Sequence, residues 1–456
     1  MTSSPQRILI IGKDSRTDAI AAACAASPRQ PELFALTEMP IPGLIEKCRA
    51  VRYGSLVELE PARAAAQEFE PDLAIVGPEE PLEAGYADEF RSLGISVFGP
   101  SKQLAAIESS KSWARSLLDR YEIPGNPDYR LFDSTEGLRE YMEDLGSFVV
   151  KPDGLTGGKG VRVFGEHLRT IDEALDYARS TVAQDGKVQI EERLEGEEFS
   201  LQTITDGVDV IHCPLVQDHK RAFDGDRGPN TGGMGSYSCP DLSLPFLERD
   251  DVARATSINE RVIDALARET GEPYRGVLYG GFMATRDGVR LIEYNCRFGD
   301  PEAMNVLPLL EADFVELCSA AAAGTLQNVG RAWKHKATVC KYLVPKGYPG
   351  AQAAAERITV PDELQTSDQL RWFWAACRED DGEVFLTASR SGAFVGIADS
   401  LEQAERIAED AARELEQRNH GSVRHRRDIG SAALVSSRVE HMHSLRSTHQ
   451  VTAGRS

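Results

Sequence analysis

Short apolar runs alternate with amphipathic stretches along the first hundred residues of the chain. The predicted strands are the runs at 7–11, 32–36, 73–77 and 95–98. Between the first two, residues 17–26 have the length and apolar spacing of a helix. Strands that alternate with helices usually form a parallel sheet, and ligands bind beyond the carboxyl ends of its strands. We therefore predict a small βαβ domain at residues 1–102, with strand ends that face a ligand.

The middle of the chain predicts a second, separate unit. Strands at 148–151 and 188–191 flank the helical stretch 170–183, and this order is typical of a small α/β lobe. A glycine-rich segment follows the first of these strands, so the lobe is expected to carry a flexible lid.

The pattern changes again farther along. Strands at 278–284 and 289–293 form a predicted hairpin, which places a larger lobe before residue 330. Strands at 337–343 and 383–388 then lead to a helix that the capping box Ser400-Leu401-Glu402-Gln403 opens.

These patterns divide the chain into five predicted segments. They are a βαβ substrate domain (1–102), a linker helix with the small lobe and lid (103–195), a large lobe with a metal site (196–330), a carboxy-terminal domain (331–430) and a disordered tail (431–456). The tail is assigned from its position and composition, because residues 421–456 hold six arginines against two acids.

Three polar residues at the end of the predicted hairpin suggest a metal-nucleotide site. Glu293 and Asn295 stand two residues apart on a strand, so both side chains point to one face and can share a hard cation. Arg297 follows at the same spacing and can reach a neighbouring anion. The alternative is an edge strand with a solvated polar face.

The glycine-rich segment after residue 150 has the composition of a phosphate-binding loop. Glycine lets backbone N–H groups approach phosphate oxygens, and Lys151 and Lys159 add positive charge. The alternative is a mobile hairpin loop. Neither the P-loop pattern nor Gly-x-Gly-x-x-Gly fits it. The glycines concerned are Gly154, Gly157, Gly158 and Gly160.

Two further segments suit an adenosine and a second anionic substrate. The strand before Glu191 runs into an acidic stretch, and a strand end followed by a carboxylate can bind an adenine edge and ribose hydroxyls. The run Gln217-Asp218-His219-Lys220-Arg221 precedes the glycine loop Gly228 to Gly235, which suits an anionic substrate. The alternatives are a solvated acidic turn and an ordinary surface loop.

Taken together, the motifs resemble the phosphoribosylamine–glycine ligase family of the ATP-grasp superfamily over roughly residues 7–430. The resemblance implies an α/β fold with an amino-terminal parallel-sheet (pre-ATP-grasp) domain, a two-lobed ATP-grasp domain and a small carboxy-terminal α+β domain. It also implies ATP-dependent joining of glycine to 5-phosphoribosylamine through glycyl phosphate, in purine biosynthesis. The motifs are Val76 to Leu82, Phe98-Gly99-Pro100, Ser110-Lys111, Lys151 to Gly160, Gln217 to Arg221, Gly228 to Gly235 and Asn295 to Glu302.

The same resemblance implies a role for each candidate residue. Glu293 and Asn295 would hold Mg²⁺, with Mn²⁺ as an alternative, and Arg297 and Asp218 would be catalytic. The expected ATP-binding residues are Lys111, Lys151, Gly157, Gly158, Lys159, Gly160, Glu191, Leu194 and Glu198. The expected substrate-binding residues are Arg16, Glu79, Lys220, Asn230 and Gly233.

The amino-terminal loop departs from the family pattern. The family has Gly-x-Gly-Gly-Arg-Glu-His-Ala, whereas the segment Gly12 to Ala19 keeps only Gly12, Arg16 and Ala19. The family's Pro-Gly-Asn-x-Gly segment is also missing. Since this lobe helps the family hold phosphoribosylamine, an ATP-grasp ligase with a different amine acceptor remains an alternative. A nucleotide-binding regulatory protein without turnover is the third hypothesis.

Composition narrows the class of protein. The net charge of −21 argues against nucleic-acid binding. Hydrophobic residues make up 41% of the chain, and no apolar run approaches the length of about 18 residues that a membrane span needs. Eight widely spaced cysteines suggest a reducing cytoplasm rather than a disulfide framework. We expect small-molecule partners and a monomer or weak homodimer.

Overall fold

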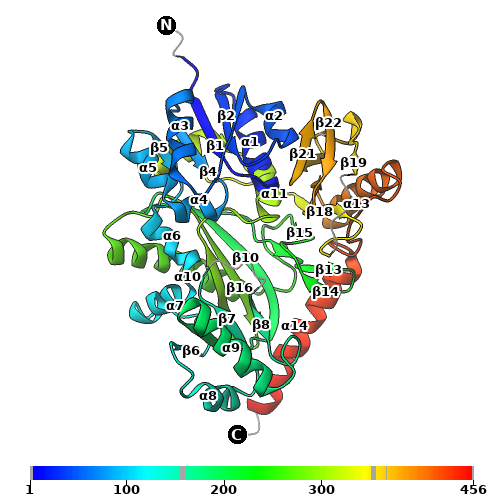
Figure 1. Cartoon of the computed structure of the whole chain (residues 1–456). Coiled ribbons are helices and arrows are strands. Elements are labelled where there is room, and N and C mark those ends of the chain that lie inside the picture. The colour runs from blue at the N-terminus through cyan, green and yellow to red at the C-terminus, as the bar shows by residue number, and fades with distance from the viewer. Residues whose placement is uncertain (1–3, 155–159, 351–355, 366, 454–456) are drawn as a thin grey trace.

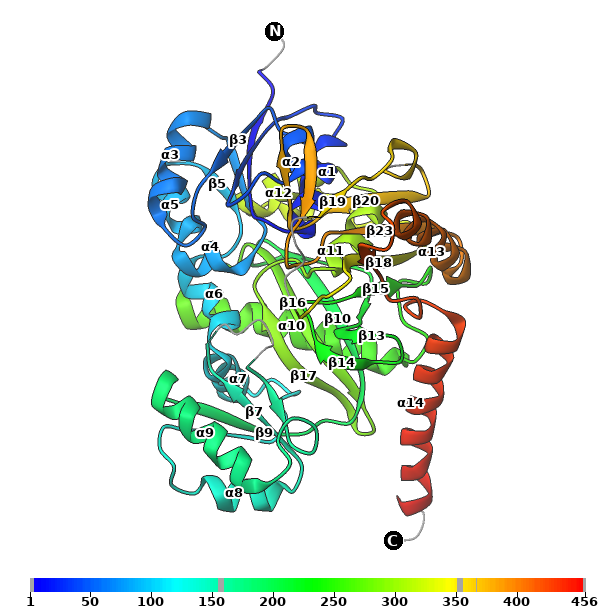
Figure 2. The same ribbon diagram turned by 45° about the vertical axis from the view of Figure 1, so that its right-hand side comes forward.

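The structure is a computed structural model that describes residues 4–154, 160–350, 356–365 and 367–453. An α/β domain lies at the amino-terminal end of the molecule, and a smaller lobe lies at the opposite end (Figure 1). A larger β-rich body stands between them and continues into the carboxy-terminal domain, which Figure 2 shows beside the amino-terminal domain.

The amino-terminal domain contains a five-stranded parallel sheet in the order β3-β2-β1-β4-β5. Residues 8–11 are fully buried, which fits a central parallel strand covered on both faces. This confirms the predicted parallel-sheet domain. The strands are β1 (Arg7–Ile11), β2 (Glu32–Thr37), β3 (Ala50–Tyr53), β4 (Leu73–Val76) and β5 (Ser96–Phe98). The helices are α1 (Ser15–Ala25), α2 (Pro42–Lys47), α3 (Leu59–Phe69), α4 (Glu79–Ala84) and α5 (Tyr86–Ser92).

Two linker helices, α6 (Lys102–Ser109) and α7 (Lys111–Arg120), lead into the small lobe. This lobe is an antiparallel sheet in the order β6-β9-β7-β8, with its own apolar core beneath two helices. The elements are β6 (Tyr129–Phe132), α8 (Leu138–Leu145), β7 (Phe148–Pro152), β8 (Arg162–Val163), α9 (Ile171–Asp185) and β9 (Val188–Glu192).

The large lobe is a four-stranded antiparallel sheet in the order β11-β10-β16-β17. The long helix α10 (Arg249–Thr270) packs on it through residues such as Ile258 and Val262. The predicted hairpin is present as β16 (Gly276–Thr285) and β17 (Gly288–Asn295), and the other two strands are β10 (Gly196–Thr205) and β11 (Val210–His212).

A third sheet runs from the large lobe into the carboxy-terminal domain. β15 (Gly235–Ser238) pairs antiparallel with β18 (Ala337–Pro345), so the sheet crosses the boundary expected near residue 330. Its order is β12-β15-β18-β23-β20, and α13 packs against it. Helix α13 begins after Ser400, whose side chain accepts from Gln403 N. The remaining members are β12 (Gln217–Asp218), β20 (Leu370–Trp374), β23 (Gly392–Ala398) and α13 (Leu401–Arg418).

Smaller elements complete this region. A hairpin of β13 (Arg221–Phe223) and β14 (Arg227–Asn230) extends from β12, and α11 (Glu302–Val306) and α12 (Phe314–Ala323) follow β17. A three-stranded sheet contains β19 (Arg357–Ile358), β21 (Cys377–Asp380) and β22 (Glu383–Leu386), and β24 (Val423–Arg424) pairs with β18.

The expected disordered tail is instead the long helix α14 (Ala432–Ala453), which runs along the large lobe (Figures 1 and 2). Met442 is 2% exposed, and Val435 and Leu445 pack against the same core. The prediction was wrong because it weighed the charge of the segment and overlooked these spaced apolar residues. No helix in the described ranges is long and apolar enough to cross a membrane.

Candidate active site

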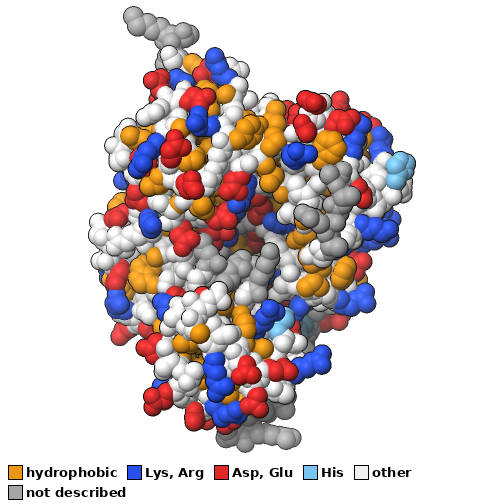
Figure 3. All heavy atoms as spheres, viewed as in Figure 1, with side chains coloured by type: hydrophobic (Ala, Val, Ile, Leu, Met, Phe, Trp, Pro, Cys, Tyr) orange, Lys and Arg blue, Asp and Glu red, His pale blue; other side chains and the backbone are white. Residues whose placement is uncertain are grey.

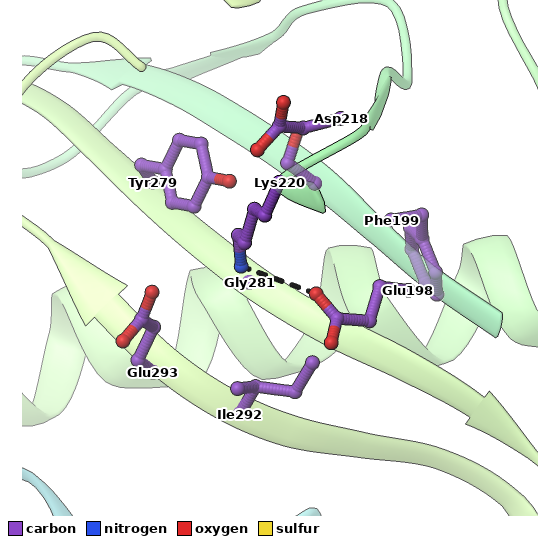
Figure 4. Close-up of a pocket in the computed structure, with 9 residues that line it drawn as sticks. Glu198, Phe199, Asp218, Lys220, Tyr279, Gly281, Ile292 and Glu293 are labelled. Carbon is purple, nitrogen blue, oxygen red and sulfur yellow. Dashed lines mark hydrogen bonds and ion pairs between the residues drawn. The ribbon is translucent and has the colours of Figure 1, made fainter. Parts of the chain in front are cut away.

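A pocket opens on the large lobe where β10, β16 and β17 meet the segment after β12 (Figure 4). On the face shown in Figure 3, the molecule is hollowed between the amino-terminal domain and the small lobe, and acidic and basic side chains gather there. The residues that line the pocket are Glu198, Phe199, Ser200, Asp218, Lys220, Tyr279, Gly281, Ile292 and Glu293.

Glu293 is the acidic centre of a cluster of lysines. Burial alone would raise the pKa of its carboxyl, but Lys220, Lys151 and Lys111 hold that pKa below its usual value. Lys220 Nζ lies 3.1 Å from Glu198 Oε2, and this carboxylate raises the pKa of Lys220 (Figure 4). The carboxylate of Glu293 is therefore charged at neutral pH and stands among cations that could bind phosphate groups.

Asp218 is the second notable acid of the pocket. Its pKa is raised well above the ordinary value, first by burial and then by the nearby Glu302. Its Oδ1 atom has no hydrogen-bond partner among the described residues. Gly233 has φ +107° and stands so close that an added Cβ would lie 2.8 Å from this oxygen. A buried acceptor without a partner favours binding of a donor such as an ammonium group.

A buried row of ion pairs joins the small lobe to β17. Lys151 Nζ lies 2.5 Å from Glu191 Oε2, and Arg115 Nε lies 2.8 Å from Oε1 of the same carboxylate. Burial would raise the pKa of Glu191, but the two cations lower it to about 2. Arg115 also donates to the carbonyl oxygen of Ile292, at 2.8 Å. Lys111 Nζ donates to the carbonyl oxygen of Gly154, at 2.8 Å.

Arg297 connects the large lobe to the amino-terminal half of the molecule. Its Nε lies 2.9 Å from Glu79 Oε2, and one of its terminal nitrogens lies 2.9 Å from Glu108 Oε1. The same nitrogen donates to Asn295 Oδ1 at 3.1 Å. Burial would lower the pKa of Arg297, but Glu108 and Glu79 raise it well above its ordinary value.

Arg16 extends this chain of charges to the first loop. It donates to the carbonyl oxygen of Phe298 at 2.6 Å and pairs with Asp14, and it lies 3.8 Å from Glu79 Oε2. The structure therefore brings Arg16, Glu79 and Arg297 into one network, although they lie far apart in the sequence.

Some predicted site residues are not among those that line the pocket. Asn230 is exposed at the end of β14, and Leu194 is half-buried in the turn between β9 and β10. Gly160 lies shortly before β8, and its carbonyl oxygen accepts from the hydroxyl of Tyr177 at 2.6 Å. The predictions for Gly157, Gly158 and Lys159 fall outside the described residues.

Sequence reasoning missed three charged residues of this region. Arg115 stands one helical turn after Lys111 in α7, so helical spacing from Lys111 could have identified it. Glu108 belongs to the preceding helix α6, and the extended Ser110 separates it from Lys111, so this spacing gave no signal for it. Arg390 had no such signal. It lies 3.2 Å from Asp300 Oδ1 and donates to the carbonyl oxygen of Gly232 at 2.7 Å, which fixes the glycine loop.

The donor set suits a cation that phosphate groups help to hold. Among the described residues, no group of three or more His, Cys, Asp or Glu side chains could bind a metal ion without help. Glu293 and Asn295 instead offer one carboxylate and one amide oxygen on the same face of β17, beside the lysines. Mg²⁺ is commonly bound by one or two carboxylates together with substrate phosphates and water, so these residues fit that ion.

A parallel-sheet domain followed by two lobes, with lysines and a carboxylate in the cleft, defines an ATP-grasp enzyme. The sequence matches three models of one family, Phosphoribosylglycinamide synthetase. Its N domain matches residues 6–108, its ATP-grasp (A) domain 109–303 and its C domain 338–432. The chain belongs to this family.

Individual relatives agree with this assignment. The chain is 44% identical over 448 residues to a phosphoribosylamine–glycine ligase of Methanopyrus kandleri, covering 96% of this chain and 99% of the relative. The corresponding enzyme of Methanocaldococcus jannaschii is 43% identical over 454 residues, with 96% and 100% covered. The crystal structure of the Thermotoga maritima enzyme superposes with a TM-score of 0.76 at 27% identity, covering 93% of this chain and 100% of that one.

Proposed function

We propose that the protein is a phosphoribosylamine–glycine ligase. It would join glycine to 5-phosphoribosylamine at the expense of ATP and release glycinamide ribonucleotide, ADP and phosphate, a step of purine biosynthesis. Full-length similarity to enzymes of that name supports the proposal. The observation that carries it is the pocket in which Glu293, Lys220 and the unpartnered Oδ1 atom of Asp218 meet.

The reaction needs activation because a carboxylate oxygen is a poor leaving group. The γ-phosphoryl group passes from ATP to a carboxylate oxygen of glycine, which gives glycyl phosphate and ADP. The amine nitrogen of phosphoribosylamine then attacks the carbonyl carbon and loses a proton, while the C–O bond to phosphate breaks. No protein nucleophile takes part, so the protein contributes alignment and compensation of charge.

The charged and polar residues in and around the pocket suit these tasks. Lys111 and Lys151 would bind phosphate oxygens of ATP, and the buried Asp218 carboxylate would accept from the ammonium group of glycine. Glu293 and Asn295 would hold Mg²⁺, which neutralises charge on the phosphate oxygens.

Arg297 would act beside the developing negative charge while it holds Asn295 in place. Its contacts with Glu79 and Glu108 fix the guanidinium between the large lobe and the amino-terminal domain. We further propose that the adenosine contacts come from Glu191, Leu194 and Glu198.

Purified protein incubated with ATP, glycine and freshly prepared phosphoribosylamine tests the activity. Glycinamide ribonucleotide, identified by mass spectrometry, should form only when all three substrates are present. Turnover with other amines but not with phosphoribosylamine would replace the proposal with a different ligase. Nucleotide binding without any turnover would instead indicate a regulatory protein.

The metal assignment is tested by Glu293→Ala. Loss of its carboxylate should abolish ADP formation while the circular dichroism spectrum stays that of the wild type. Glu195→Ala, which removes an exposed carboxylate from the turn before β10, is the matched control and should keep full activity. A near-normal rate for Glu293→Ala would refute the role of Glu293.

Three finer points belong to the same proposal. We propose Mg²⁺ as the metal, with Mn²⁺ able to replace it. We also propose a cytoplasmic location, which the eight buried cysteines without disulfides support. The partners are small molecules, and the protein acts as a monomer or weak homodimer.

A further inference from the structure

Helix α14 lies beyond the segment that the C-domain model of the family matches. The C-domain model of the family ends at residue 432, where α14 begins. The helix nevertheless packs on β10 and β16, two strands of the large lobe that also line the pocket. It therefore stands on the reverse side of the sheet segment that carries the site.

Alternation along the chain links this helix to the pocket. Glu198, Asp218 and Lys220 line the pocket. Their neighbours Glu197 and Gln217 are buried, and successive side chains of a strand point to opposite faces. These neighbours thus form a layer directly behind the pocket residues, and α14 covers that layer.

Glu197 is the acid at the centre of the hidden layer. It is 5% exposed, and His441 Nδ1 of α14 lies 2.6 Å from its Oε1. Arg438 Nε, one helical turn earlier, lies 3.4 Å from its Oε2. Gln217 Nε2 lies 3.3 Å from the same Oε2 and donates to the carbonyl oxygen of Glu198 at 3.1 Å.

Arg438 also reaches the loop that follows Lys220. It pairs with Asp226, to which Arg426 donates at 3.0 Å. Burial would raise the pKa of the Asp226 carboxyl, but the imidazole of His219 and the guanidinium of Arg438 hold that pKa well below the usual range. Arg438 of α14 therefore connects β10, through Glu197, to the turn between β13 and β14, through Asp226.

We propose that Arg438 and His441 are positioning residues, which hold Glu197 and Asp226 and so fix Asp218 and Lys220 at the pocket. A buried carboxylate that loses its cation must find another partner or move toward water. Without Arg438, the carboxylate of Glu197 would shift. Gln217, which donates to that carboxylate, would shift with it and displace the neighbouring Asp218. The effect on glycine rests on the ligase function proposed above, whereas the effect on the position of the loop does not.

Arg438→Gln is the test, and Arg446→Gln is its matched control. Arg446 belongs to the same helix, and its side chain is 18% exposed against 20% for Arg438. It pairs with Glu248 and Asp251 at the start of α10, away from the pocket. Both variants weaken the docking of α14, but only the first releases the layer behind Asp218.

Steady-state kinetics should separate the two variants. We expect Arg438→Gln to raise the KM for glycine about tenfold or more and to lower kcat, because small displacements at a reacting centre are costly. The KM of Arg438→Gln for ATP should stay within about twofold of the wild-type value. All kinetic constants of Arg446→Gln should also stay within about twofold of the wild type. Arg438→Lys, which keeps the charge, should recover part of the loss. Equal constants for the glutamine variants would overturn the proposal.

Hydrogen exchange gives a readout that needs no turnover. The amide of His219 donates to Gly235 at 3.0 Å, and the amide of Met234 donates to His219 at 2.8 Å. Both should exchange faster in Arg438→Gln and not in Arg446→Gln. Unchanged exchange in Arg438→Gln would refute the positioning role, whether or not the wild type ligates glycine. Absence of wild-type ligation with the expected exchange would refute the ligase function alone.

A second variant covers the case in which Arg438→Gln does not fold. In the pair Glu197→Gln with Arg438→Gln, the buried negative charge disappears together with its cation. This protein should fold and bind glycine better than the single variant, as a double-mutant cycle would measure. A double variant no better than Arg438→Gln would contradict the role of Glu197.

Discussion

Glu108 and Glu79 both contact the buried Arg297, and a substitution of Glu108 tests which of the two acids is ionised beside it. Glu108 Oε1 lies 2.9 Å from Arg297, and Oε2 accepts from Cys296 N at 2.8 Å. Burial, with a smaller contribution from Glu79, raises the pKa of Glu108 to about 7, whereas Arg297 opposes that rise. The pKa of Glu79 is lowered to about 2, since Arg297 and Arg16 outweigh its burial. Near neutral pH, Glu79 thus carries the charge that balances Arg297.

The raised pKa of Glu108 determines how the stability of the fold changes with pH. Between pH 4.5 and about 7, Glu108 is protonated in the folded state and ionised in the unfolded state. Folding therefore takes up a proton, and stability falls as the pH rises through this window. At about 1.4 kcal/mol per pH unit, the loss approaches about 3 kcal/mol and levels off above pH 7.

Glu108→Gln removes the carboxyl group that titrates, and this pH dependence of stability should disappear with it. The free energy of unfolding of the variant, minus that of the wild type, should rise by about 3 kcal/mol between pH 4.5 and pH 7.5. Urea denaturation followed by tryptophan fluorescence at each pH measures the difference, and Glu136→Gln at the exposed surface is the control. A difference that stays constant over this range would mean that Glu108 is ionised throughout, and the reasoning would fail.

Three further substitutions test separate parts of the structure. Arg115→Met leaves the buried Glu191 with one cation and should cost about 3–5 kcal/mol of stability. An unchanged urea midpoint would contradict the importance of this pair. Lys341 is fully buried and pairs with two glutamates of α13, so Lys341→Met leaves both carboxylates without this cation. The variant should be less stable by a similar ~3–5 kcal/mol, which its melting temperature would show. Gly233→Ala forces a Cβ to within 2.8 Å of Asp218 Oδ1 and should raise the KM for glycine. If calorimetry gave wild-type affinity for glycine, Asp218 would not be its ligand.

Much of the fold could be predicted because its strands have strong apolar patterns. The first strand matches β1 at both ends, and the predicted hairpin corresponds to β16 and β17. The sheet that crosses from the large lobe could not be predicted. β12 and β15 have two and four residues, which is too short to show the alternation of apolar and polar residues that predicts a strand. In addition, β15 pairs with β18, about a hundred residues farther along the chain.

The candidate site shows a similar division. Motifs made Lys151 and Arg297 candidates because their neighbours in the sequence are distinctive. Their partners were harder to foresee, since an ion pair needs proximity in space and leaves no mark in local sequence. Arg297 is held by Glu79 and Glu108, which lie about two hundred residues earlier in the chain. The contacts of α14 with Glu197 could not be foreseen either, because they form only when the large lobe has folded.

The charges of the altered amino-terminal loop are paired with one another and with neighbouring acids. The positive end of α1 lies near the carboxyl edge of the parallel sheet, where an anion would normally bind. Asp14 occupies this end, and its carboxylate accepts from Thr17 N at 3.0 Å and pairs with Arg16. Lys13 is 2.9 Å from Glu38. Each cation of the loop thus already faces a carboxylate, so a substrate phosphate at this edge must compete with Asp14 for the helix end.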